Sequence, residues 1–237
     1  MKRALLVGIL YSITLVAIAQ TVIEKAWTTS ASPEGLQLID SRINELVTDL
    51  NNHHYRNDTR KLNALFVKTH NRFLHTYDQY SGIEGLVKGH YDCLTATSLF
   101  ADVLGRAGYN YNIIETNYHI FIMVNTRDGE VLLETTDRLG GFIDNQERMN
   151  NVLGQYRRNI LNDARPQQYQ YNFSLFKEVD VDQLPGLLYF NQAVKAFNAE
   201  KWDECSEKLS AAAMSTNSPH IAELTELLHR QPYFSGR

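Results

Sequence analysis

The stretch that decides the fold is Tyr91-Asp92-Cys93-Leu94-Thr95-Ala96-Thr97-Ser98-Leu99-Phe100, which places a cysteine at the start of a predicted helix. Apolar residues then recur on one helical face, at Leu94, Leu99, Phe100, Val103, Leu104 and Ala107. Gly105 and Gly108 mark the end of the helix, and Asp92 is suited to cap its start. Backbone N–H groups and the positive end of the helix dipole favour a thiolate at such a position. The pattern is typical of a nucleophilic cysteine.

Three strand-like runs follow this helix, at residues 111–116, 119–125 and 130–137. Between the last two lies Arg127-Asp128-Gly129, which is typical of a three-residue hairpin loop with glycine in the left-handed position. We therefore expect an antiparallel sheet after the cysteine helix.

The length of this loop sets the register of the hairpin. A three-residue loop pairs Thr126 with Glu130, and continuing that ladder places His119 opposite Asp137. Directly opposed side chains share one face of the sheet, with Cβ atoms about 4.5–5.5 Å apart. Asp137 would then hold one ring nitrogen of His119 while the other nitrogen faces a thiol. A slip of one residue would put the two side chains on opposite faces.

The order of these residues resembles the transglutaminase-like branch of the papain-like cysteine enzymes. The segments that carry the resemblance are Tyr91-Asp92-Cys93, Tyr118-His119-Ile120-Phe121 and Glu134-Thr135-Thr136-Asp137, within residues 60–145. The resemblance implies an α+β fold in which a helix bearing the nucleophile packs on an antiparallel sheet that carries the base and its orienting acid. No tryptophan lies near the cysteine or the histidine, unlike in better-known members.

The segment from Tyr77 to His90 is polar, aromatic and rich in glycine, and it leads directly to Cys93. Loops held beside a nucleophile often carry contacts to substrate. Gln79, Tyr80 and Tyr91 are the candidates for oxyanion or substrate contact, although two of the three would be ordinary surface or packing residues.

The N-terminal residues 1–19 have the layout of a secretory signal peptide. Lys2 and Arg3 precede the apolar run 4–18, and Ala17-Ile18-Ala19 is a small-residue cleavage site before Gln20. A retained membrane anchor is the alternative, but the run is shorter than the ~20 residues of a spanning helix. We expect an exported protein, periplasmic or extracellular, without stable membrane insertion after cleavage.

Composition limits the partners. Of the whole chain, 43% is apolar and 21% charged, as in folded globular proteins. Removing residues 1–19 leaves 21 basic and 27 acidic residues, a net charge of −6, which disfavours nucleic acid. No cysteine–histidine cluster has the spacing of a zinc site, so we expect neither a metal nor a cofactor.

Two amphipathic helices are predicted ahead of the cysteine helix. The first runs from Pro33 to Leu50 behind Ser32, and the second starts near Asp58. The second should bury one face, formed by Leu62, Leu65, Phe66, Thr69 and Phe73.

The C-terminal residues 179–237 resemble one tetratricopeptide helical hairpin with a capping helix. The residues that carry the resemblance are Ala193, Phe197, Trp202, Cys205, Leu209 and Ala212, with a turn at 198–201. A last helix is predicted from Ser218-Pro219 through Leu228. A single repeat cannot bury its own faces, so this module should pack on the domain formed by residues 20–178.

Cys93 and Cys205 are the two cysteines of the chain. The resemblance makes Cys205 a small packing residue between helices. A disulfide joining the two is the alternative, since the chain is expected in an oxidising compartment.

Two functional classes remain open. The first is an exported thiol enzyme that performs acyl transfer on a peptide, protein or small amide, with Cys93, His119 and Asp137 as a triad. It would be a peptidase, an amidase or a transglutaminase-type crosslinker. The second is a catalytically silent scaffold that binds a protein through the old cleft or the C-terminal helices. In one version of it, Cys93 is a buried core thiol and His119 bonds Asp137 for stability.

Overall fold

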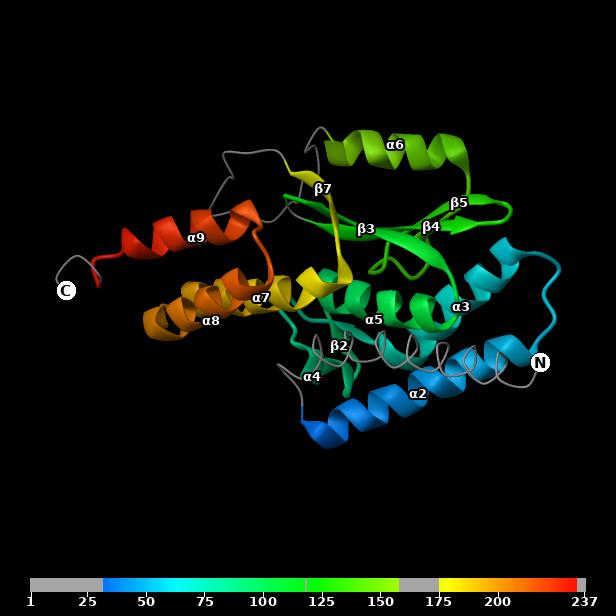
Figure 1. Cartoon of the computed structure of the whole chain (residues 1–237), viewed down its shortest axis with the longest axis horizontal. Coiled ribbons are helices and arrows are strands. Elements are labelled where there is room, and N and C mark those ends of the chain that lie inside the picture. The colour runs from blue at the N-terminus through cyan, green and yellow to red at the C-terminus, as the bar shows by residue number, and fades with distance from the viewer. Residues whose placement is uncertain (1–31, 118, 158–174, 234–237) are drawn as a thin grey trace, which may run out of the picture.

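The computed structural model of the protein describes residues 32–117, 119–157 and 175–233, and Figure 1 shows the chain. The predicted signal peptide 1–19 and its cleavage site lie outside the described residues. Within the described ranges, no helix is both long and apolar enough to cross a membrane.

A five-stranded sheet forms the centre of an α+β fold. Its order is β6-β5-β4-β3-β7, and all neighbouring strands are antiparallel. The strands are β3 (Asn110–Thr116), β4 (Ile120–Thr126), β5 (Gly129–Leu133), β6 (Phe142–Ile143) and β7 (Phe176–Val179). The three strands predicted from the sequence are thus present, with the third ending four residues earlier than expected.

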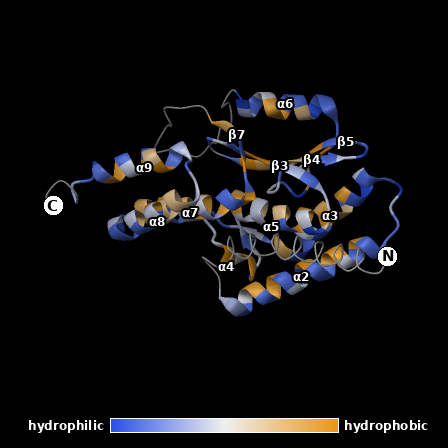
Figure 2. Cartoon of the chain, viewed as in Figure 1, coloured by the Kyte–Doolittle hydropathy of each residue, from blue (hydrophilic) through white to orange (hydrophobic). Residues whose placement is uncertain are grey.

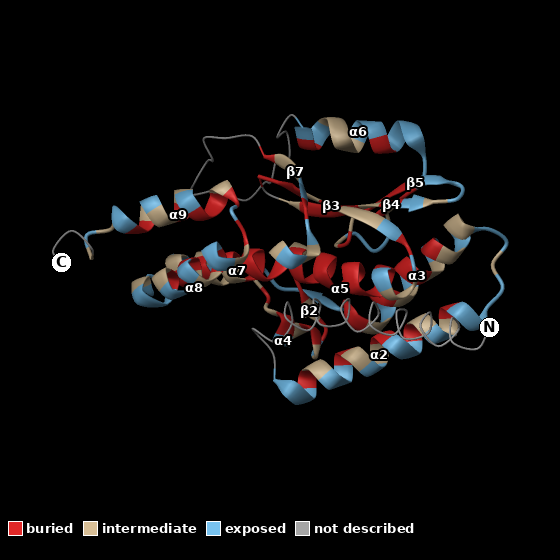
Figure 3. Cartoon of the chain, viewed as in Figure 1, coloured by how far each residue is buried: buried red, intermediate tan, exposed pale blue. Residues whose placement is uncertain are grey.

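Helices cover both faces of this sheet. Helix α5 (Cys93–Arg106) packs on one face against β3 and β4, and α6 (Gln146–Arg157) covers the other (Figure 1). Helices α2 (Pro33–Asn52) and α3 (Asp58–Phe73) pack on the outer side of α5. Buried residues fill nearly all of α5, whereas α2 and α6 each keep an exposed face (Figure 3). The central helix that carries Cys93 is therefore held from several sides.

The two N-terminal helices begin where their capping residues predict. The hydroxyl of Ser32 accepts the Gly35 N–H at 3.1 Å, with Pro33 in the first turn. The predicted packing face of α3 is confirmed, because all five of its residues are buried. Hydrophobic and hydrophilic residues alternate along α2 in Figure 2, as expected of a helix with one buried stripe.

The segment before Cys93 contains short elements that the sequence did not predict. Strand β1 (Thr76–Tyr77) pairs in parallel with β2 (His90–Tyr91), and α4 (Ile83–Leu86) lies between them. The backbone N–H of Asp78 also donates to the carbonyl of Tyr91 at 2.8 Å. These bonds hold the start of the loop beside the residues that lead into α5.

The C-terminal part forms the predicted helical hairpin. A short 3-10 turn, η1 (Val181–Gln183), leads into α7 (Leu184–Asn198), followed by α8 (Trp202–Ser215) and α9 (Pro219–His229). The first turns of α7 join the main core beside α5, while the rest forms a separate apolar cluster with Cys205 inside it. Packing of the module on the rest of the protein is confirmed. Strand β7 crosses the predicted boundary at 178/179 by one residue.

The predicted register of the β4–β5 hairpin is wrong by one residue. Thr126 pairs with Gly129 and Asn125 with Glu130, so the loop has two residues, Arg127 and Asp128. Gly129 has a φ of +135° and begins β5 instead of ending the loop. The hydroxyl of Thr126 accepts the Asp128 N–H at 3.2 Å and donates to the Gly129 carbonyl at 2.7 Å. These two hydrogen bonds stabilise the two-residue turn.

Candidate functional site

Cys93 is the first residue of α5, as predicted, and its side chain is partly exposed. A reciprocal cap fixes this helix start: Thr95 N–H donates to Oδ1 of Asp92, and the Asp92 N–H donates to the Thr95 hydroxyl, both at 2.8 Å. The cap positions the backbone that carries the thiol.

His119 directly precedes β4, which begins one residue later than predicted, and hydrogen bonds in both directions tie its backbone to the end of β3. The Thr116 N–H and hydroxyl donate to the His119 carbonyl at 2.8 and 2.9 Å, and the His119 N–H returns a bond to that hydroxyl at 3.0 Å. The backbone of the histidine is therefore fixed before its side chain makes any contact.

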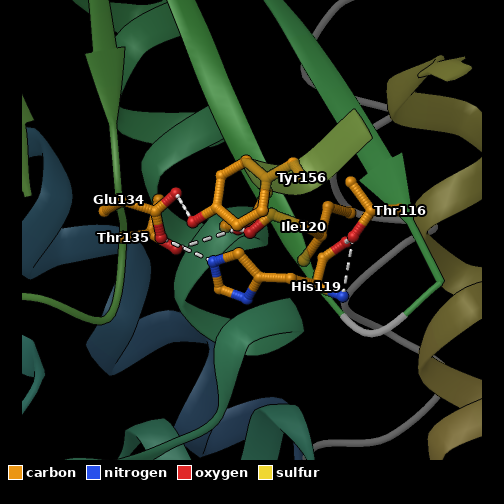
Figure 4. A network of polar contacts seen from close by, with 7 residues as sticks. Thr116, His119, Ile120, Glu134, Thr135 and Tyr156 are labelled. Carbon is orange, nitrogen blue, oxygen red and sulfur yellow. Dashed lines mark hydrogen bonds and ion pairs between the residues drawn. The ribbon is translucent and has the colours of Figure 1, made fainter. Parts of the chain in front are cut away.

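The imidazole of His119 contacts a carboxylate that the sequence did not predict. Nε2 of His119 lies 2.5 Å from Oε2 of Glu134, and the side chains of the two residues are only 15% and 12% exposed. The other carboxylate oxygen, Oε1, accepts the hydroxyl of Tyr156 at 2.5 Å. Figure 4 shows Glu134 between the ring nitrogen and the phenol. Both carboxylate oxygens are thus engaged.

The predicted hydrogen bond between His119 and Asp137 is wrong. Oδ1 of Asp137 accepts the N–H groups of Leu139 and Gly140 at 3.1 and 2.9 Å, so this carboxylate organises its own loop. The one-residue change of register is the physical reason. Continued by one pair beyond Ile122 and Leu133, the observed register sets Glu134 across from Phe121, and therefore diagonal to His119 on the same face, within reach of a long side chain.

The chain also leaves the sheet before Asp137. Strand β5 ends at Leu133, and the Asp137 N–H then donates to the Glu134 carbonyl at 3.1 Å in a turn. The Gly141 N–H closes the loop on the Asp137 carbonyl at 2.8 Å. A β-carbon on Gly141 would lie 2.2 Å from the Glu134 carbonyl oxygen, so this close approach requires glycine.

The electrostatics of the site favour a charged imidazole. Burial alone would lower the pKa of His119, but the charge of Glu134 and the hydrogen bonds to Cys93 and Glu134 raise it to about 10. His119 therefore carries a proton at neutral pH. Because Nε2 faces Glu134, the remaining ring nitrogen, Nδ1, is the one available to the Cys93 thiol. The site can thus present an imidazolium to a sulfur nucleophile.

Tyr156, from α6, is a second site residue, besides Glu134, that the sequence analysis missed. Its ring stacks on Phe121 at 5.0 Å between centroids and lies 5.6 Å from the His119 ring. Burial and the neighbouring Glu134 raise the pKa of its hydroxyl, which therefore keeps its proton as a donor. A signal was present, because apolar residues recur at helical spacing at Met149, Val152, Leu153 and Tyr156.

The three candidates for oxyanion contact lie in different environments. Tyr91 is buried on β2 against Tyr77, with ring centroids 5.8 Å apart, and burial raises its pKa. Gln79 is exposed, and Tyr80 is partly buried with a left-handed φ of 61°. The pairing of β1 with β2 brings this segment beside the residues that precede Cys93. The geometry makes Tyr91 a packing residue.

The second cysteine contrasts with the first. Cys93 and Cys205 are both free, so they form no disulfide, and Cys205 is fully buried between α7 and α8. Burial raises the pKa of the Cys205 thiol to about 11. Its position agrees with the predicted packing role.

Groups of three or more His, Cys, Asp or Glu side chains that could hold a metal ion are absent from the described parts of the chain. Comparisons of the sequence and the structure with protein-family models, with curated proteins and with solved structures give no match.

Proposed function

We propose that this protein is a thiol enzyme that transfers an acyl group from an amide or peptide bond. Cys93 is the nucleophile, His119 the acid and base, and Glu134 the group that orients the imidazole. The observation that carries the proposal is the position of the His119 ring. It bonds Glu134 through Nε2 at 2.5 Å, interacts with Cys93, and has its pKa raised by both.

The reaction follows from these roles. The Cys93 sulfur attacks the amide carbonyl carbon, and the C–N bond breaks as His119 donates its proton to the leaving amine. The product of this step is a thioester on Cys93. Water or an acceptor amine then attacks the thioester and His119 takes the proton from the attacking group. The C–S bond breaks and the Cys93 sulfur leaves as a thiolate beside the re-formed imidazolium, which restores the starting state. The Glu134 side chain orients the ring and stabilises the imidazolium.

The arrangement of the cysteine helix and the sheet supports the same class. A helix that begins with the nucleophile packs on an antiparallel sheet that carries the base, the arrangement that the resemblance to transglutaminase-like enzymes implies. The acid comes from Glu134, three residues before the position that the resemblance indicated. We further propose that residues 1–19 direct export, that residues 20–178 form the enzyme domain, and that the C-terminal module is tetratricopeptide-like.

The developing oxyanion requires donors near Cys93. At a helix start the first N–H groups lack intrahelical partners, and the N–H of Cys93 is one of them. Gln79 is the side chain of the preceding loop that we favour as a second donor, because it is exposed and follows Asp78, which bonds Tyr91.

Alkylation by iodoacetamide, a small amide electrophile, tests the proposal without a known substrate. We expect Cys93 of the folded protein at pH 7 to react at least about tenfold faster than glutathione, and Cys205 not to react. His119→Ala should lower the rate at Cys93, while Cys205→Ala, the matched control, should leave it unchanged. Modification of Cys205 in preference to Cys93, or a Cys93 no faster than glutathione, would refute the thiol enzyme.

A further inference from the structure

The C-terminal module contacts the start of the cysteine helix directly. Nδ2 of Asn191, on α7, donates to Oδ2 of Asp92 at 2.8 Å. The other oxygen, Oδ1, accepts the N–H and the hydroxyl of Thr95 at 2.8 and 2.9 Å. Asp92 is only 2% exposed, so its carboxylate relies on these donors instead of water. One of its two oxygens is held by a helix about a hundred residues away in the chain.

This bond acts on the residue next to the nucleophile. Asp92 caps α5 and Cys93 follows it immediately, so the side-chain geometry of Asp92 sets where the helix begins and where the thiol lies. Burial raises the pKa of Asp92, whereas the bonds from Thr95 and Asn191 lower it. Without Asn191, the buried carboxylate loses one of its donors and the cap loosens.

The same module also contacts the strand that holds His119. The hydroxyl of Ser218, before α9, donates to Oε1 of Glu115 at 3.0 Å, and both residues are buried. Glu115 precedes Thr116, whose N–H and hydroxyl fix the backbone of His119. His220 lies beside the same carboxylate, with Nε2 3.9 Å from Oε1 of Glu115. The two halves of the site, separate in sequence, are thus attached to one helical module.

We propose that α7–α9 form a positioning module of the active site and that Asn191 is a positioning residue for Cys93. The inference rests on the proposed function for the role of Cys93. It gives the module the task of positioning the active site instead of binding an independent partner.

The test measures the rate of iodoacetamide alkylation at each cysteine by peptide mapping of the folded, full-length protein. Asn191→Leu keeps a side chain of similar size but removes the donor, and we expect the rate at Cys93 to fall about tenfold. The pH dependence of alkylation at Cys93 should also shift, while Cys205 should remain unreactive. Gln192→Leu, which changes the neighbouring amide of α7, is the matched control and should leave Cys93 unchanged.

A double exchange sharpens the test. Asn191→Asp alone sets two carboxylates against each other and should lower the rate at Cys93 further. Combined with Asp92→Asn it restores a donor–acceptor pair, because the new amide at position 92 can accept from Thr95 and donate to the new carboxylate at position 191. We expect the rate of this double variant to return to within about threefold of the wild type.

Several results would overturn the inference. Asn191→Leu with an unchanged rate at Cys93 is one, and equal acceleration of Cys93 and Cys205 is another, because it indicates general loosening of the fold. If Asn191→Leu does not fold, Asn191→Ser, which is smaller and cannot reach Asp92, is measured in its place. The same two results would then overturn the inference. A wild-type Cys93 no faster than glutathione would refute the proposed enzyme, while the ratio between variant and wild type would still decide the role of Asn191.

Discussion

Two histidines of this protein, one largely and one fully buried, are in opposite states of charge. The side chain of His119 is 15% exposed and that of His70, on α3, is fully buried. His119 bonds Glu134, and its pKa rises to about 10. The His70 ring contacts the rings of Phe66 and Phe100, with centroids 4.6 and 5.5 Å away, and neither of its nitrogens has a hydrogen-bond partner among the described residues.

The electrostatic surroundings explain the difference. Burial and, to a smaller extent, the charge of Arg138 lower the pKa of His70 to about 4, and the charge of Asp137 only partly opposes them. For His119 the same effect of burial is outweighed by Glu134 and Cys93. A direct hydrogen bond to a carboxylate therefore keeps the His119 imidazole charged, whereas burial dominates at His70. This criterion separates the candidate site from a core histidine.

Glu134→Gln should have the largest effect, because it makes the surroundings of His119 resemble those of His70. The amide keeps the shape but removes the charge, so the pKa of His119 should fall well below about 10. We expect the alkylation rate of Cys93 at pH 7, or turnover once a substrate is known, to fall about 10²–10³-fold. Titration of the His119 ring by NMR measures the shift directly.

The same substitution should change how stability depends on pH. A raised folded pKa contributes stability that is present below about pH 6.5 and is lost as pH rises through about 10. Glu134→Gln should lose this contribution below pH 6.5 and show a flatter stability profile up to pH 10 in urea unfolding. A variant in which His119 still titrates above pH 9 would contradict the role of Glu134.

His70→Leu tests the other side of the comparison. The folded pKa of His70, about 4, is below its unfolded value of about 6.5, so the unfolded chain binds the extra proton first as pH falls. The wild type should therefore lose about 2 to 3 kcal/mol through His70 between pH 6.5 and 4. The leucine variant should keep this stability in acid.

Urea unfolding of both proteins at pH 7.5 and 4.5 measures the difference. His220, whose pKa burial also lowers to about 4, makes the same contribution in both proteins and cancels in the comparison. Equal losses of stability in acid for variant and wild type would show that His70 does not stay neutral in the core.

The sequence was sufficient for the parts of the site that depend on local signals. Cys93 at a helix start follows from Asp92 and the apolar spacing after it. The apolar run after His119 predicts a strand there, and β4 begins one residue later, at Ile120. Which carboxylate meets His119 depends on the length of the β4–β5 loop, and that loop makes contacts with residues far away in the sequence. The Thr59 N–H donates to Asp128 at 2.8 Å and the Arg127 N–H to Asp58 at 3.2 Å, which docks the hairpin loop on the start of α3.

Such contacts cannot be read from the hairpin itself. Arg127-Asp128-Gly129 allows a two- or a three-residue loop, and the docking on α3 accompanies the shorter one. The helical spacing around Tyr156 was a local signal for its burial. Its contact with Glu134 is long-range, because Tyr156 lies on α6 and Glu134 directly follows β5. Long-range packing therefore decided which carboxylate meets the histidine.

Tyr156→Phe should have a smaller effect than Glu134→Gln, because it removes one bond to the carboxylate and keeps its charge. The ring would still stack on Phe121 at about the same place, so the fold should be retained. We expect about a tenfold fall in the rate of Cys93 alkylation, the usual scale for one hydrogen bond to a charged group. A rate within twofold of the wild type would show that Tyr156 only packs.

Asp137→Asn should have the smallest effect, and it separates the two carboxylates of the loop. The amide oxygen of asparagine can still accept the N–H groups of Leu139 and Gly140, so the turn is preserved. We expect the alkylation rate of Cys93 to stay within about twofold and the His119 titration to be unchanged. His70 should respond instead, because Asp137 raises its pKa and the variant should therefore lower it further. A fall in the alkylation rate of Cys93 as large as that of Glu134→Gln would return the orienting role to Asp137. A shifted pKa of His119 with an unchanged pKa of His70 would reverse the assignment of the two carboxylates.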